Sequence, residues 1–197
     1  TGIPSAMSKA FTRESNDGDN ADGLDDGPAP MPPEAPKGAK NYITPGGYSR
    51  LKTELKAMVE KERPEGVRTV SWAASNGYRS GTGDSIYVKL RLREIDRRIR
   101  FLTKRMDAAV VVDPAAREDT DQVFFGATVT VMGVDGVEKT FSIVGIDETD
   151  MSRGRISWIS PLAKALIKSR EGDTVIVRTP GGDETMEMVA VEYKAID

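Results

Sequence analysis

The sequence predicts an α+β protein, in which an N-terminal antiparallel α-helical coiled-coil hairpin precedes a C-terminal antiparallel sheet with one helix. Two patterns predict this class. Apolar residues recur at heptad spacing in the first half, whereas they alternate at a spacing of two from Val123 onward. The expected domains are a tail over residues 1–40, the hairpin over residues 41–113 and the sheet domain over residues 114–197.

The first 40 residues are expected to be a disordered, acidic and proline-rich tail. Six carboxylates lie between Glu14 and Asp26, and five prolines follow within residues 28–36. So little apolar surface cannot offset the entropy lost on ordering. Residues 1–6 precede Met7 and are interpreted as a cloning remnant.

The first helix is predicted to begin at Thr44-Pro45. Threonine caps unpaired amides at a helix start, and proline fits the first helical position. Apolar residues then follow at spacings of three and four, namely Tyr48, Leu51, Leu55 and Met58. Pro64 and Gly66 predict a kink or a phase slip, and Asn76-Gly77 predicts the end of the helix.

The second helix carries an unbroken heptad seam, made of Val88, Leu92, Ile95, Ile99, Leu102, Met106 and Ala109. Asp84 or Ser85 is expected to cap its start, and Asp113-Pro114 to end it. A helix of about 25 residues is about 37 Å long. Two such helices joined by a short loop pack antiparallel, which predicts the hairpin.

The C-terminal part reads as short strands separated by turns. Asp135-Gly136 is expected to form a hairpin turn, Pro180-Gly181-Gly182 a second turn, and Ser160-Pro161 to open a short helix. The predicted strands cover residues 123–131, 141–145, 155–159, 174–178 and 186–193. They predict a small antiparallel sheet with one helix.

Composition excludes several function classes. The chain has no cysteine and no histidine, which excludes disulfides, cysteine nucleophiles and histidine-based triads or metal cages. No apolar run approaches the roughly 20 residues of a membrane span, and no signal peptide is recognised. We therefore expect a cytoplasmic protein without a membrane partner.

The charge is distributed unevenly. Residues 41–106 hold 15 basic and 7 acidic residues, giving +8, whereas residues 107–197 hold 9 basic and 17 acidic residues, giving −8. The positive charge gathers on the second helix and near the tip, at Arg79, Lys89, Arg91, Arg93, Arg97, Arg98, Arg100 and Lys104. Such a face favours a polyanion such as a nucleic-acid backbone. The alternative is a solvated face with intrahelical ion pairs.

The predicted tip shows no catalytic constellation. Its glycines do not follow a strand, so they do not form a phosphate-binding loop. Asp84 stands alone, without the second carboxylate that two-metal or acid–base chemistry needs. Trp72 and Tyr87 are expected to pack rather than to stack on bases.

Several segments closely resemble the GreA/GreB family of bacterial transcript cleavage and elongation factors, on the GreB side. They are KERPE at 61–65, V-x-WAAS at 70–75, RLREIDRRIRFLTK at 91–104, VFFGA at 123–127, SPLAKALIK at 160–168, GDTVIVRTPGG at 172–182 and VEY at 191–193. The resemblance covers roughly residues 41–197.

The resemblance implies an FKBP-like C-terminal domain that docks on RNA polymerase at the rim of its secondary channel. The hairpin then enters the channel, where it can meet the 3′ end of the nascent RNA. Two acids at the family's tip help hold the second catalytic magnesium ion, and the polymerase itself cleaves the RNA. This implies a monomeric accessory factor that is not an enzyme and has no cofactor of its own.

The tip departs from the family pattern. The family reads approximately GDRSENAD, whereas residues 77–84 read GYRSGTGD. Tyr78 and Gly81 replace the two acids, and Asp84 matches a later one. A phenol is uncharged near neutral pH and glycine has no ligand atom, so neither replaces a metal-binding carboxylate. In the docking loop, Ile159 precedes Ser160-Pro161 where the family usually carries a polar residue.

The leading hypothesis is a GreB-like factor that binds in the secondary channel, stimulates transcript cleavage weakly or not at all, and acts as a competitor or regulator. The runner-up is an ordinary factor of this family that still promotes cleavage. An engineered loss-of-function tip would give the same sequence pattern as a natural one. A prolyl isomerase and a free-standing nucleic-acid-binding protein are alternatives from other classes.

Overall fold

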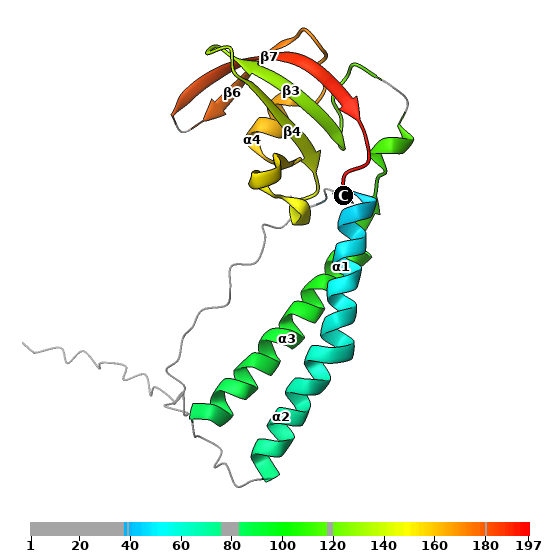
Figure 1. The fold of residues 1–197 in the computed structure, drawn as a ribbon, viewed down its shortest axis with the longest axis vertical. Helices are drawn as coiled ribbons and strands as arrows, with labels where there is room; N and C mark the ends of the chain where they lie inside the picture. The colour runs from blue at the N-terminus through cyan, green and yellow to red at the C-terminus, as the bar shows by residue number, and fades with distance from the viewer. Residues whose placement is uncertain (1–37, 39, 76–82, 118–119, 180) are drawn as a thin grey trace, which may run out of the picture. The chain divides into compact units, whose positions relative to one another are not determined.

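The helical region comes first and the sheet second, which confirms the α+β class (Figure 1). The structure is a computed structural model that describes residues 38, 40–75, 83–117, 120–179 and 181–197. These residues belong to one compact unit. The tail, apart from residues 38 and 40, lies outside the described residues, as do tip residues 76–82.

Helix α1 (Pro45–Ala57) begins as predicted. Thr44 is its N-cap residue, and the Thr44 hydroxyl accepts a hydrogen bond from the Gly47 amide at 3.1 Å. Pro45 occupies the first turn, where a missing N–H costs nothing. The capping signal in the sequence was therefore sufficient to locate this start.

A π-helical segment, Met58–Glu62, connects α1 to α2 (Arg63–Ser75). The kink predicted at Pro64 takes this form. Proline has no N–H to donate to the carbonyl four residues before it, and its ring crowds that carbonyl. Widening the preceding turn is one of the few ways in which a helix can continue through such a site.

Helix α3 (Gly83–Asp107) lies antiparallel beside α2 (Figure 1). Its bounds correct two predictions. It begins at Gly83, so Asp84 and Ser85 lie within its first turn instead of preceding it as caps. It ends at Asp107, and the chain then forms strand β2 (Ala109–Val111), which pairs in parallel with β1 (Asn41–Ile43). Strands of three residues are too short to leave an alternation pattern in the sequence.

The hairpin has a buried core at its base, next to the sheet, and a further buried side chain, Ile95, beside Gly66 in the distal half. This base core consists of Ile43, Leu51, Phe101 and Leu102. The predicted seam is confirmed there, because Tyr48, Leu55, Met58 and Met106 pack against it. No residue of α2 is buried. In that distal half Gly66 allows close helix contact, since an added Cβ would lie 3.3 Å from Leu92 Cδ1.

The sheet has five strands in the order β5-β4-β3-β7-β6. They are β3 (Ala127–Gly133), β4 (Glu138–Val144), β5 (Arg155–Ser157), β6 (Thr174–Thr179) and β7 (Gly182–Tyr193). β3 and β4 form the predicted hairpin around Gly136, which has a φ of 72°. The pairing of β4 with β5 is parallel, which differs from the fully antiparallel sheet that we expected.

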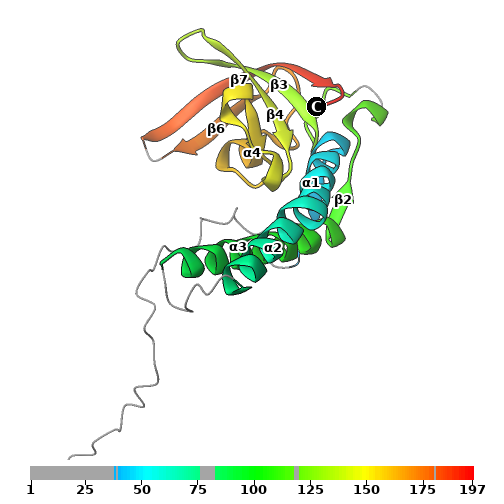
Figure 2. The ribbon, with the colours of Figure 1, turned by 60° about the horizontal axis from the view of Figure 1, so that its bottom comes forward.

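Helix α4 (Pro161–Leu166) lies under one face of the sheet (Figure 2). Its Ala163 and Leu166 are fully buried against inward-facing residues of the strands, such as Val129. This is the main core of the protein. The fold therefore consists of a sheet domain with its own core and a helical hairpin anchored beside it.

Candidate functional site

Two of the arginines predicted to face a polyanion instead hold the hairpin together. Arg98 on α3 donates two hydrogen bonds to Glu54 on α1, at 2.7 and 3.0 Å. Arg91 lies 3.5 Å from Glu62 and 3.3 Å from Glu94. Of these contacts, Arg91–Glu94 is an intrahelical pair of the kind that the alternative interpretation expected, whereas Arg98–Glu54 and Arg91–Glu62 join two helical segments.

Four of the remaining predicted cations form a row on another face of α3. We call this row the basic stripe; it consists of Arg93, Arg97, Arg100 and Lys104. Spacings of four, three and four residues place all of them on one helix face, and all four are exposed. Within the part of the chain that the structure describes, Arg93, Arg97 and Arg100 have no ion-pair partner. The stripe can therefore bind phosphates without first breaking an ion pair of those three arginines.

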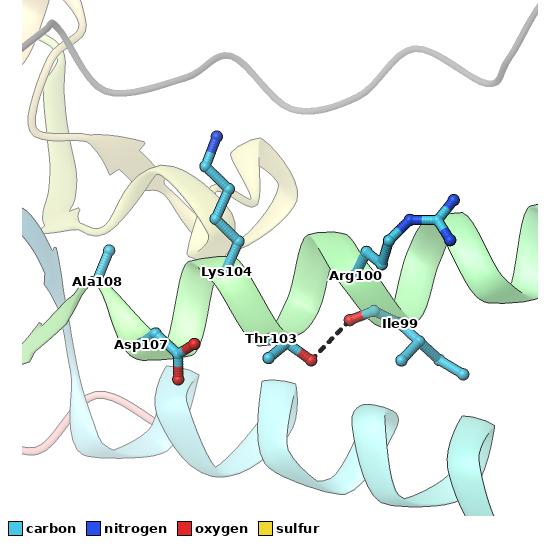
Figure 3. Close-up of a pocket in the computed structure, with 6 residues that line it drawn as sticks. All are labelled: Ile99, Arg100, Thr103, Lys104, Asp107 and Ala108. Atoms are coloured by element: carbon cyan, nitrogen blue, oxygen red, sulfur yellow. Dashed lines mark hydrogen bonds between the residues drawn. The ribbon is translucent and has the colours of Figure 1, made fainter.

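An open groove of about 570 Å³ lies along the basal part of the stripe (Figure 3). Arg100 and Lys104 extend from α3 on the side opposite the neighbouring helix, and the Thr103 hydroxyl donates to the Ile99 carbonyl at 2.9 Å. Asp107 and Ala108 complete the lining. Two cations one turn apart beside an open groove suit an extended anionic chain.

Arg105 belongs to the same basic helix but not to its surface. It is buried, and its guanidinium Nε lies 3.4 Å from Asp147 Oδ1. The Arg105 carbonyl accepts a hydrogen bond from the Asn41 side chain at 3.2 Å. Burial raises the pKa of Asp147, and the positive charge of Arg105 opposes this shift. The composition of the helix did not distinguish this internal cation from the surface ones.

Glu148 forms a second polar contact between the sheet domain and the hairpin. Its carboxylate accepts hydrogen bonds from the Thr44 and Gly145 amides, both at 2.9 Å, and from the Thr44 hydroxyl. An added Cβ at Gly47 would lie 2.1 Å from Glu148 Oε1, so only glycine leaves room for the carboxylate. We call Asn41, Thr44, Arg105, Asp147 and Glu148 the junction network.

The residues expected to dock on polymerase begin helix α4. The Ser160 hydroxyl accepts a hydrogen bond from the Ala163 amide at 3.1 Å, and Pro161 takes the first helical position. Ile159 is partly buried, and its amide donates to the Ser157 hydroxyl at 3.3 Å. The start of helix α4 therefore accounts for serine and proline at these two positions without any contact to another protein. Their role in docking stays a prediction.

Trp72 and Tyr87 are exposed and do not pack in a core as expected, although Trp72 keeps an interaction within the protein. Trp72 on α2 is 60% exposed and Tyr87 on α3 is 70% exposed. Among the side chains with described burial, none on α2 and none at residues 86–94 of α3 is buried, so none of these forms a buried layer over either ring. Heptad position could have signalled this, because neither residue falls on the predicted seam.

The tip positions Tyr78, Arg79 and Gly81 lie outside the described residues, while Asp84 lies in the first turn of α3. Lys89 is exposed on the distal part of α3. Among the residues with described positions, no three acidic side chains gather as a metal site would require. Nor does any helix in that part of the chain have the length and apolar content to cross a bilayer.

Two family models match the chain. The N-terminal domain of the transcription elongation factors matches residues 41–111, and the C-terminal domain of the GreA/GreB factors matches residues 118–193. The chain belongs to the GreA/GreB family of transcription elongation factors. The resemblance seen in the sequence motifs is thereby confirmed, and relatives place the chain on the GreB side of the family.

Transcription elongation factor GreB of Neisseria meningitidis serogroup A is 63% identical over 158 residues, which are 80% of this chain and 97% of that protein. GreB of Yersinia pestis is 43% identical over 157 residues, 80% of this chain and 91% of that protein. Among solved structures, the Gfh1 protein of Thermus thermophilus matches with 23% identity and a TM-score of 0.38, over 78% of this chain and 99% of that one.

Proposed function

We propose that this GreB-like elongation factor binds RNA polymerase through the secondary channel and stimulates transcript cleavage weakly or not at all. The single observation that carries the proposal is the tip sequence GYRSGTGD at residues 77–84. Tyr78 and Gly81 stand where the family has its two acids. The factor has no magnesium site of its own in this proposal and acts near the ion that the polymerase holds.

The missing carboxylates have a direct chemical consequence. A carboxylate oxygen is a preferred ligand of magnesium, whereas a neutral phenol and a glycine offer no equivalent. Ligands that stabilise a metal only in the transition state contribute to the rate and not to binding. Their loss therefore lowers cleavage by orders of magnitude while leaving occupancy of the channel intact.

The exposed cations of the basic stripe support the proposed binding to RNA polymerase. The basic stripe presents exposed cations along α3, and positive charge accelerates the approach to a negatively charged channel or to the RNA within it. In the proposal the sheet domain docks through the loop at Ile159, Ser160 and Pro161, and the factor works as a cytoplasmic monomer. A factor that binds without cleaving competes with active family members.

Competition and cross-linking test this binding. Core RNA polymerase is incubated with an active GreB and increasing amounts of this chain, and retained GreB is measured. We expect displacement at comparable concentrations. With a photo-reactive residue at position 78, we expect cross-links to the polymerase subunits that surround the catalytic centre. Absence of both displacement and cross-links would overturn the proposal.

The runner-up is an ordinary factor of this family that promotes cleavage of backtracked RNA. Asp84 is the acid that could support it, since it aligns with a later acid of the family tip. The two functions share the same binding site and differ only in the rate of RNA shortening. A cleavage assay therefore separates them.

A further inference from the structure

We propose that Trp72 and Tyr87 form an aromatic pair that stacks on unpaired bases of single-stranded RNA. The pair lies on the distal hairpin and is separate from the tip positions that the family uses for metal binding. The inference rests on the proposed function only for the source of the RNA, which is the transcript in the polymerase. Its physical basis is the register of α2 and α3.

The ion pair between Arg63 and Asp96 fixes that register, with Arg63 Nε 2.8 Å from Asp96 Oδ1. Trp72 lies nine residues from Arg63 toward the tip, and Tyr87 lies nine residues from Asp96 toward the tip. Nine residues are about 13 Å along a helix axis. The two rings therefore lie at the same height on the antiparallel helices.

Both rings also lie on the same side of the hairpin. The Arg63 and Asp96 side chains are 49% and 32% exposed, so their ion pair lies on one open flank of the hairpin. Nine residues are about two and a half turns, which turns each ring away from that flank and toward the other one. The helices are regular across both intervals. Single exposed apolar side chains are common on protein surfaces. Two large exposed rings at one height and on one side are a surface that another molecule can cover.

Positive charge next to the rings favours RNA over a protein partner. Arg68 precedes Trp72 by four residues and Arg91 follows Tyr87 by four, so each ring has an exposed arginine one turn farther from the tip. Arg91 already contacts Glu62 and Glu94, but exposed ion pairs are weak and exchange readily. Aromatic rings beside arginines are typical of surfaces that stack bases and hold phosphates.

The test measures binding of the full chain to labelled oligouridine of about ten nucleotides at about 50 mM salt, where phosphate contacts are strong. Duplex RNA of the same length is the control. We expect Trp72→Ala and Tyr87→Ala each to weaken oligouridine binding about tenfold, and Trp72→Phe to weaken it less than about threefold. Duplex binding should change less than about twofold, because duplex bases are already stacked.

Trp72 also reports on stacking directly. In a Trp158→Phe background it is the remaining tryptophan, since the chain has two, and oligouridine should quench its fluorescence. Thermal melting checks that the variants fold. The proposal is overturned if wild type shows no saturable oligouridine binding, or if the alanine variants bind it as wild type does. Equal losses for single-stranded and duplex RNA would also overturn it.

Polymerase binding by the same variants separates the two proposals. Variants that keep their affinity for oligouridine but no longer bind core polymerase would assign the rings to a protein contact and overturn the stacking role. Wild type that binds oligouridine through the rings but not polymerase would leave the stacking role standing and refute the channel-binding function.

Discussion

The base and the distal half of the hairpin are built from the same two helices but differ in how they are stabilised. At the base, Leu102 is fully buried and the junction network ties α1 and α3 to the sheet domain. In the distal half α2 has no buried residue, and the buried Ile95 side chain of α3, the close approach at Gly66 and partly exposed ion pairs hold the helices together.

The difference indicates a division of roles. The base carries the apolar and buried polar contacts that fix the hairpin, so substitutions there should act on stability. The distal half carries exposed arginines and aromatic rings, so substitutions there should act on binding and leave stability almost unchanged.

The largest expected effect is the loss of a core side chain at the base. Leu102→Ala removes a fully buried side chain and should lower the free energy of unfolding by about 3 kcal/mol. Val67→Ala in the distal half is the matched control; Val67 is 42% exposed, and its loss should cost less than about 0.5 kcal/mol. Urea unfolding measures both. Similar losses in the free energy of unfolding at the two positions would show that the base and the distal half do not differ in stability.

The next effect comes from the junction network. Glu148→Ala leaves the buried amides of Thr44 and Gly145 without their acceptor, and the expected cost is about 2–3 kcal/mol. Glu192→Ala is the control, because Glu192 makes only an exposed ion pair with Lys194 at 3.0 Å. A loss at Glu148 no larger than at Glu192 would show that the network does not anchor the hairpin.

The smallest expected effect is a change in how the melting temperature depends on pH when Asp147 is replaced. Burial holds its folded-state pKa above the ordinary value of 3.8, so the folded protein binds this proton more tightly than the unfolded chain. Relative to Asp147→Asn, wild type should therefore gain stability as the pH falls through the raised pKa, whereas at pH 7 the variant also leaves the buried Arg105 guanidinium without its carboxylate partner. Melting curves across that range measure it. A difference in melting temperature between wild type and variant that stays constant across that pH range would contradict the raised pKa.

Sequence patterns predicted the parts of the fold that rest on local signals. The Thr44-Pro45 cap, the heptad seam and the turn at Gly136 each depend on neighbouring residues, and the structure confirms them. The parallel pairings of β1 with β2 and of β4 with β5 were missed, because they join short segments whose partners are distant in sequence.

The candidate site was predicted less completely. The positive charge of α3 was evident, but its division among surface, interhelical and buried roles depends on acids from other elements, such as Glu54 and Asp147. Glycine is a weak helix former, and the sequence around Gly47 does not show that this glycine makes room for the Glu148 carboxylate. Contacts across the fold, not local composition, decide these roles.

Cleavage of RNA in a stalled, backtracked polymerase complex measures whether the altered tip has lost cleavage stimulation. We expect wild type to leave the 3′ end intact at ordinary magnesium concentrations, and Tyr78→Asp combined with Gly81→Glu to restore rapid shortening. Rapid shortening by wild type, or a restored tip that binds the complex but remains inactive, would contradict this expectation.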